Sequence, residues 1–192
     1  GMSHALAHHA HPDAEVVGLV NRSPVDLPEV LAAYPFYSSL EEGLAATSPD
    51  LAVIATYSDS HADFACMAME AGAHVFIEKP LATTVADAER VVAKAVETGK
   101  KLVVGYILRH HPSWVKLIEE ARDLGGPYVF RLNLNQQSSG AEWETHKALM
   151  HTTSPIVDCG VHYVDVMCQI TDAQPVWVNG MGLRLSDEIA ED

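Results

Sequence analysis

The sequence is poor in basic residues. Its 12 lysines and arginines face 26 aspartates and glutamates, which gives a formal net charge of −14 over 192 residues. A phosphate backbone or an anionic lipid surface would repel such a chain, so we expect neither nucleic acid nor membrane as a partner. The sequence also lacks an apolar run of about 18 residues, the length that a membrane-spanning helix needs.

Cysteine is scarce as well. The three cysteines, Cys66, Cys159 and Cys168, are odd in number and lack the paired spacing of zinc or redox motifs. With no pattern typical of a signal peptide, we expect three core thiols in a reducing cytoplasm. The 11 histidines contain no His-Glu-x-x-His or comparable spacing, so we predict no metal site.

Apolar residues make up 48% of the chain, enough for a packed core. Short apolar runs alternate with helical patterns as far as residue 106. We expect strands at 15–20, 36–37, 51–56, 75–78 and 101–105, and helices at 5–11, 27–34, from 40 onward, at 61–70 and at 86–97. Runs without polar alternation are typical of parallel strands that helices cover, so we predict a doubly wound, Rossmann-like α/β domain over residues 1–108.

The pattern changes after Pro112. An amphipathic helix is expected at 114–124, and at 128–135 apolar and polar residues alternate as in a sheet with one solvated face. Residues 136–151 are polar and irregular. Ser154 and Pro155 are expected to open a helix that continues to residue 170, and 176–185 is strand-like. Residues 109–192 are therefore predicted to form a partial α+β substrate domain.

Two stretches carry candidate chemistry. The apolar run 75–77 ends abruptly in Glu78-Lys79-Pro80, which delivers an amine to the carboxyl end of a strand, where open α/β sheets bind ligands. Downstream, Asp158 and His162 are spaced to share one helix face, and Asp165 could join them. A carboxylate beside an imidazole suits proton exchange with an alcohol. Either stretch alone is also compatible with a surface turn or a structural hydrogen bond.

Three motifs, in this order and spacing, resemble one known family. They are Val-Phe-Ile-Glu-Lys-Pro-Leu at 75–81, Gly-Tyr-x-x-Arg-x-x-Pro at 105–112 and Asp-x-x-x-His-x-x-Asp at 158–165. Together they resemble the glucose-fructose oxidoreductase and inositol dehydrogenase family, often written Gfo/Idh/MocA. Ile54-Ala-Thr56 followed by Ser60-His61 looks like that family's loop over the nicotinamide ribose. The resemblance covers nearly the whole chain.

The resemblance implies an NAD- or NADP-dependent oxidoreductase that moves a hydride to or from a sugar, polyol or related hydroxylated substrate. Lys79 would orient and polarise the substrate oxygen, His162 would act as acid and base, and Asp158 would hold or assist His162. Such chemistry needs a proton acceptor and positive charge at the developing alkoxide, while the cofactor takes the hydride.

The resemblance also implies contacts for the ligands. Thr56, His61 and Glu78 are expected to bind the cofactor, and Arg109 and Asn135 to face the substrate hydroxyls.

The adenosine end of the cofactor is expected at the end of the second family strand. Asn21 stands where an acidic residue would bind the ribose 2′-hydroxyl, and Arg22 and Ser23 beside it favour a 2′-phosphate.

The sequence departs from the family pattern at both ends, so we expect a truncated member. The first strand and most of the Gly-x-Gly-x-x-Gly turn are missing, and Gly1-Met-Ser-His4 matches only its last glycine and the histidine after it. That strand lies in the middle of a doubly wound sheet. Its neighbours are expected to pair directly, to shift, or to borrow a strand from another copy, which predicts a homo-oligomer. The alternative function is a truncated, non-catalytic relative that serves as a ligand-binding or interaction domain.

Overall fold

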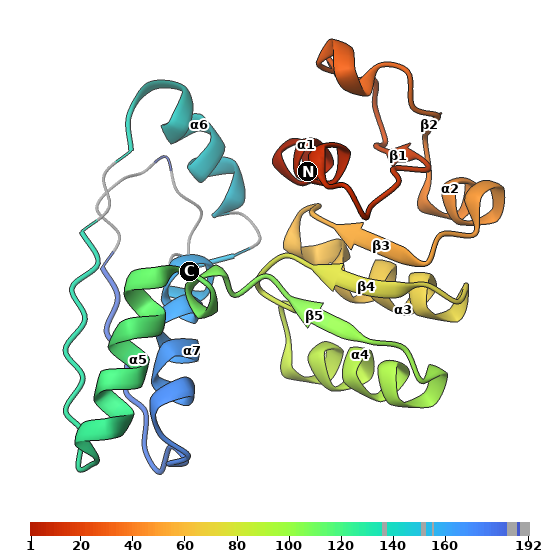
Figure 1. The fold of residues 1–192 in the computed structure, drawn as a ribbon. Coiled ribbons are helices and arrows are strands. Elements are labelled where there is room, and N and C mark those ends of the chain that lie inside the picture. The colour runs from red at the N-terminus through yellow and green to blue at the C-terminus, as the bar shows by residue number, and fades with distance from the viewer. Residues whose placement is uncertain (136–137, 151–152, 155, 184–187, 189–192) are drawn as a thin grey trace. The chain divides into compact units, whose positions relative to one another are not determined.

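The structure is a computed structural model that describes every residue except 136–137, 151–152, 155, 184–187 and 189–192. The chain divides into two compact units, Gly1–Gly105 and Tyr106–Asp192 (Figure 1). This division lies close to the boundary expected after residue 108. Among the described residues, every helix is too short or too polar to cross a membrane.

A three-stranded parallel sheet forms the centre of the first unit. Its strands β3 (Leu51–Ile54), β4 (His74–Ile77) and β5 (Leu102–Val104) are ordered β3-β4-β5. Helices α3 (His61–Glu70) and α4 (Val85–Thr98) are the crossovers that parallel neighbours require. The strands and helices predicted between residues 51 and 105 are therefore confirmed.

The start of the chain forms a smaller, separate pair of strands. Strand β1 (Leu19–Val20) pairs in parallel with β2 (Phe36–Tyr37), and helices α1 (Met2–Ala10) and α2 (Leu40–Thr47) flank them in sequence. Within the described residues no ladder joins β1 to β3, so the two strands do not pair directly. The strand expected at 15–20 is reduced to its last two residues, because β2 offers only two partners.

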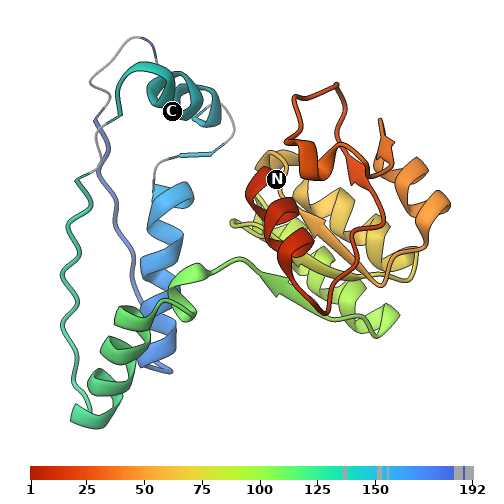
Figure 2. The same ribbon diagram turned by 45° about the horizontal axis from the view of Figure 1, so that its top comes forward.

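The two faces of the larger sheet are covered differently. Val75 and Ile77 of β4 are almost fully buried and belong to the core that α3 and α4 cover. Phe76 points to the opposite face, because strand side chains alternate, and its ring lies 5.2 Å from the His4 ring of α1. Figure 2 accordingly shows α1 on the side of the sheet away from α3 and α4.

Local capping explains where two of these helices begin. Ser39 caps α2 by accepting a hydrogen bond from the Glu42 amide at 3.2 Å, and Thr84 caps α4 by accepting one from the Asp87 amide at 3.1 Å. Gly99 ends α4 with a φ of +66°, a conformation that suits glycine. Both predicted helix starts are confirmed.

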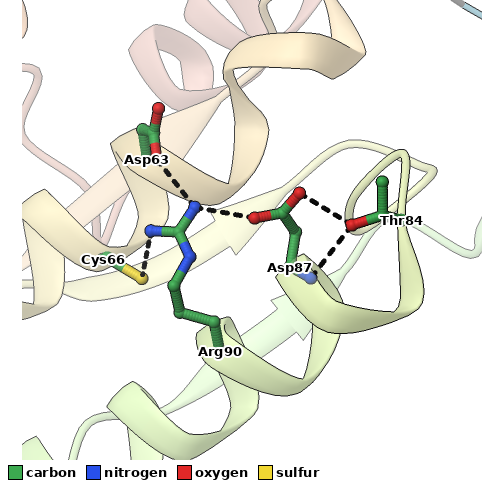
Figure 3. A network of polar contacts seen from close by, with 5 residues as sticks. All are labelled: Asp63, Cys66, Thr84, Asp87 and Arg90. Atoms are coloured by element: carbon green, nitrogen blue, oxygen red, sulfur yellow. Dashed lines mark hydrogen bonds and ion pairs between the residues drawn. The ribbon is translucent and has the colours of Figure 1, made fainter.

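Arg90 fastens α4 to α3 (Figure 3). Its Nη2 donates to Asp63 at 2.7 Å and to Asp87 at 3.0 Å, and its Nη1 lies 3.8 Å from the Cys66 sulfur. The hydrogen bonds to the two carboxylates raise the pKa of Arg90, and burial raises the pKa of the Cys66 thiol. Cys66 is thus a core thiol held in its neutral form. Cys159 is only partly buried and Cys168 is exposed, so the expectation of three core thiols is wrong for Cys168.

The regular elements in the described part of the second unit are helices. It contains α5 (Pro112–Leu124), α6 (Gly140–Leu149) and α7 (Val161–Ile170), with a 3-10 turn at Ile107–Arg109 and a π-helical turn, η4, at Ile156–Gly160. Its core joins α5 and α7 through Ile118, Val166 and Ile170.

Four expectations of secondary structure are wrong. Residues 27–34 form only a 3-10 turn at Glu29–Leu31 in place of a helix. Residues 128–135 and 176–183 are not strands, because a strand exists only with a partner and none of the described residues pairs with them. The stretch expected to be irregular contains α6 at Gly140–Leu149, while its residues 136–137 and 151 lie outside the described residues. Residues 184–185 of the last expected strand and the helix-opening Pro155 lie outside the described residues.

Candidate functional site

The carboxyl ends of β3 and β4 lie side by side in the first unit. The Glu78 amide donates to the Ile54 carbonyl at 2.9 Å, and the Gly105 amide donates to the Ile77 carbonyl at 2.7 Å. Residues that follow these strands therefore emerge at one edge of the sheet. Ligands of open α/β sheets bind at this edge.

Lys79 is the second residue after β4 and is partly buried, before the buried Pro80. His61, 1% exposed, fixes this turn from the start of α3: its Nδ1 lies 2.7 Å from the Pro80 carbonyl oxygen and its Nε2 lies 3.2 Å from the Thr56 carbonyl oxygen. His61 thus ties the end of β3 to the turn that carries Lys79. Its described contacts are with backbone, and its predicted contact with the cofactor stays a prediction.

Thr56 brings a hydroxyl to the same edge. Its Oγ1 lies 2.8 Å from the Ser60 Oγ, which itself donates to the Tyr57 carbonyl at 2.8 Å. These hydroxyls are in the exposed loop between β3 and α3. They are placed where a ribose or phosphate of a ligand could accept or donate hydrogen bonds.

Glu78 makes a contact that the sequence did not predict. Its Oε1 accepts a hydrogen bond from the His4 Nε2 of α1 at 2.7 Å, and its Oε2 accepts one from the Lys79 amide at 3.2 Å. A Cβ atom at Gly105 would lie 3.2–3.4 Å from the carboxyl atoms, so the carboxylate also packs closely on the end of β5. The Gly-x-x-His spacing at 1–4 was the only sequence signal for His4.

Gly1 places the first turn of α1 near the same edge. It is the N-cap of α1, and a Cβ atom there would lie 3.8 Å from the Ala55 carbonyl oxygen, just after β3. The free amides of a helix start favour anions, and this is where dinucleotide-binding folds receive the pyrophosphate. The first unit therefore retains a fitting position for that group.

The predicted adenosine-side residues lie together after β1. The backbone amide of Asn21 donates a hydrogen bond to the Tyr37 carbonyl at 3.1 Å. The side-chain amide of Asn21 donates one to the Ser23 carbonyl at 2.7 Å. Asn21, Arg22 and Ser23 are all exposed. Asn21 thus shapes the turn that presents Arg22 to solvent.

In the second unit, Asp158 and His162 lie on either side of the junction between η4 and α7. The Asp158 carboxylate accepts from the Cys159 thiol at 3.5 Å, and the His162 ring meets the Tyr106 ring edge-on at 6.5 Å between centroids. Single π-helical turns are frequent at functional sites. Ser154 opens this segment by accepting from the Asp158 amide at 2.8 Å.

Asp165 binds Arg109. The Arg109 Nε donates to Oδ2 at 2.9 Å and the Nη2 donates to Oδ1 at 2.5 Å, and these hydrogen bonds raise the pKa of Arg109. The guanidinium lies 5.1 Å from the centre of the Tyr106 ring. Burial raises the pKa of the Tyr106 phenol, and the negative charge of Asp165 raises it further. The buried Asp165 therefore pairs with Arg109, which lies 56 residues away in the sequence. The spacing of Asp158, His162 and Asp165 did not predict this contact.

Asn135 is exposed at the end of the extended segment 128–135. The substrate contacts predicted for Asn135 and Arg109 stay predictions. In the part of the chain that the structure describes, no three histidine, cysteine or acidic side chains gather as a metal ion would require.

Comparison with known proteins identifies the family. Residues 1–106 match the model of the oxidoreductase family with an NAD-binding Rossmann fold, GFO_IDH_MocA. The chain belongs to the Gfo/Idh/MocA family. The family resemblance read from the three motifs is confirmed, and so is the Rossmann-like α/β fold.

Gfo/Idh/MocA relatives match much of this chain. The 4-carboxy-2-hydroxymuconate-6-semialdehyde dehydrogenase of Sphingobium sp. is 31% identical over 172 residues, which are 83% of this chain and 54% of that protein. The inositol 2-dehydrogenase of Salmonella typhimurium is 31% identical over 121 residues, 62% of this chain and 34% of that protein. The chain thus spans between a third and about half the length of these relatives.

Solved structures of NAD-binding proteins superpose on this chain. An NAD-binding protein from Listeria innocua superposes with a TM-score of 0.68 at 28% identity, over 88% of this chain and 51% of that chain. GenD2 from gentamicin A biosynthesis, solved in complex with NAD, superposes with a TM-score of 0.58 at 28% identity, over 62% of this chain and 35% of that chain.

Proposed function

We propose that this chain forms the nucleotide-binding part and a portion of the substrate domain of an NAD(P)-dependent oxidoreductase. Its substrate is a sugar, a polyol or a related hydroxylated compound. The observation that carries the proposal is the position of Lys79 at the carboxyl edge of a parallel sheet of the NAD-binding Rossmann type. The relatives named as inositol dehydrogenases support this substrate class.

The cofactor is held by residues of the first unit. The start of α1, capped by Gly1, receives the pyrophosphate, and Thr56, His61 and Glu78 lie on the nicotinamide side. Asn21 and Ser23 hold the turn at the adenosine ribose. Arg22 provides a positive charge there, which predicts that NADP binds at least as tightly as NAD.

Lys79 and His162 divide the work on the substrate. The Lys79 ammonium orients the reacting oxygen and stabilises negative charge that develops on it. The His162 imidazole takes the hydroxyl proton in the oxidation and returns it in the reduction, and Asp158 orients that imidazole. When bound, the nicotinamide accepts or supplies the hydride. Arg109, fixed by Asp165, and Asn135 bind the remaining hydroxyl groups of the substrate.

Substitution of the two reacting groups tests this assignment. Lys79→Ala and His162→Ala should each lower kcat by about 100-fold or more, with unfolding curves close to that of the wild type. Lys116→Ala is the matched control, because its ammonium pairs with the exposed Glu120 at the surface of α5. Wild-type turnover in Lys79→Ala or His162→Ala would refute the assignment.

We also propose that the protein self-associates in a reducing cytoplasm. Val20 of β1 and Leu51 of β3 are 43% and 45% exposed, and apolar strand edges of this kind pair with other chains. Three free cysteines fit a reducing compartment. Equilibrium sedimentation at tens of micromolar should detect a dimer or a larger species, and a clean monomer would contradict self-association.

A further inference from the structure

The His4–Glu78 pair joins two parts of the first unit that have different tasks. His4 lies in the first turn of α1, which the proposed function assigns to the cofactor pyrophosphate. Glu78 directly precedes Lys79, to which the proposed function assigns the substrate oxygen. The 2.7 Å hydrogen bond between the His4 Nε2 and the Glu78 Oε1 spans 74 residues of sequence.

The Glu78 carboxylate is held on three sides. His4 donates to one oxygen, the Lys79 amide donates to the other, and the carboxyl group lies close to Gly105, where a Cβ atom would come within 3.2–3.4 Å of it. His4 itself packs on Phe76 at 5.2 Å, and its carbonyl accepts from the His8 Nδ1 at 2.8 Å within α1. Both side chains of the pair are about a quarter to a third exposed, at 27% and 29%. Each is thus anchored on its own element.

This geometry gives Glu78 a structural role beside its proposed contact with the cofactor. Each of its oxygens accepts one hydrogen bond from the protein, and a carboxylate oxygen can accept a second one from a ligand. Its hydrogen bond to the Lys79 amide fixes the backbone from which the Lys79 side chain departs. A lysine on a flexible four-carbon stem gains precision when its backbone is held.

We propose that His4 is a positioning residue: acting through Glu78, it fixes the backbone of Lys79 to the first turn of α1. The ammonium of Lys79 and the phosphate-binding helix start are then held in one fixed arrangement before any ligand binds. This inference rests on the proposed function for the roles of the two elements. The coupling itself is a property of the protein without ligand.

The hydrogen-exchange rate of the Lys79 backbone amide measures the coupling between His4 and the Lys79 backbone directly. In His4→Leu the apolar contact with Phe76 remains but the donor is lost, so the Lys79 amide should exchange about tenfold faster. His4→Gln places an amide nitrogen at a similar reach and should restore slow exchange. His9→Leu, on the same helix but bonded to Tyr34, should leave the Lys79 amide unchanged.

A second perturbation reaches Glu78 without touching α1. Gly105→Ala puts a methyl group within 3.2–3.4 Å of the carboxyl atoms, and Gly105 has no positive φ that would itself forbid alanine. The carboxylate must shift by a few tenths of an ångström. The Lys79 amide should again exchange faster, although His4 is intact.

Turnover gives the functional readout. His4→Leu should lower kcat about tenfold with KM within about twofold of wild type, because positioning acts on the reacting lysine and not on substrate affinity. His4→Gln should recover most of kcat. A raised KM with unchanged kcat would overturn the positioning role.

The exchange experiment separates the two proposals. If the wild type neither binds a dinucleotide nor turns over, the proposed function fails, yet the Lys79 amide still decides whether His4 holds this turn. An unchanged Lys79 exchange rate in His4→Leu would overturn the inference, whatever the activity. Faster exchange in His4→Leu with slow exchange in His4→Gln and His9→Leu would support it.

Discussion

Replacing Asp165 by asparagine should destabilise the second unit by about 2 kcal/mol. Breaking a buried ion pair from one side costs about 3–5 kcal/mol, whereas an exposed pair contributes about 0–1 kcal/mol. The Asp165 side chain is 6% exposed, but that of Arg109 is 43% exposed, so water can solvate the guanidinium after the substitution. The intermediate burial of the pair therefore places the cost between the two limits.

Tryptophan fluorescence during urea unfolding measures this cost selectively. All three tryptophans, at 114, 143 and 177, belong to the second unit. Trp114 also packs against the core cluster that contains Val166 and Ile170. Its emission therefore follows the unfolding of the α5–α7 core in which Asp165 sits.

The matched control is Glu120→Gln, which makes the same chemical change in an exposed pair. Lys116 and Glu120 of α5 are 69% and 59% exposed, so this substitution should cost about 0.5 kcal/mol or less. If Asp165→Asn costs no more than Glu120→Gln, the Arg109–Asp165 contact does not stabilise the unit and the reasoning from burial is wrong.

Three further substitutions or modifications test the first unit. Ile77→Ala, at a fully buried position of β4, should lower the free energy of unfolding by about 3 kcal/mol in circular-dichroism melts; a loss below about 1 kcal/mol would show that the core is not packed as described. Thr84→Ala removes the cap of α4 and should cost about 1 kcal/mol by the same assay, while Thr84→Ser should be nearly neutral. Because burial raises the pKa of Cys66, iodoacetamide at pH 8 should alkylate it more slowly than the exposed Cys168, and equal rates would contradict this.

The sequence predicted the first unit well between residues 51 and 105, where each element carries its own local signal. Thr84 and Gly99 mark the two ends of α4, and the uninterrupted apolar residues of β3 and β4 indicate buried parallel strands. Such signals depend on a few neighbouring residues, so they predict the same element in any fold that provides a core for it to pack against.

The misses have distinct physical causes. At 27–34 only Leu31 is buried, so the segment has no apolar face wide enough to stabilise a full helix. At 128–135 the alternation is real, but an isolated extended segment has no partner for its backbone groups among the described residues. At 140–149, residues with good helix propensity form α6 although their apolar residues lack helical periodicity, so the pattern gave no sign of a helix.

The candidate site also combines a feature that the local sequence predicted with contacts that it did not predict. The position of Lys79 followed from local sequence, because an apolar strand that ends in a lysine can be read directly. The contacts of His4 with Glu78 and of Arg109 with Asp165 could not be predicted, since they join residues 74 and 56 positions apart that only the tertiary fold brings together.

Calorimetric titration of the whole chain with NAD and with NADP tests the central claim most directly. That claim is that the carboxyl edge of the β3-β4-β5 sheet, with the start of α1, binds a nicotinamide dinucleotide. The account predicts a dissociation constant below about 1 mM for at least one of the two, with NADP at least as tight as NAD. No heat of binding with either dinucleotide, from a protein that is folded by circular dichroism, would contradict it.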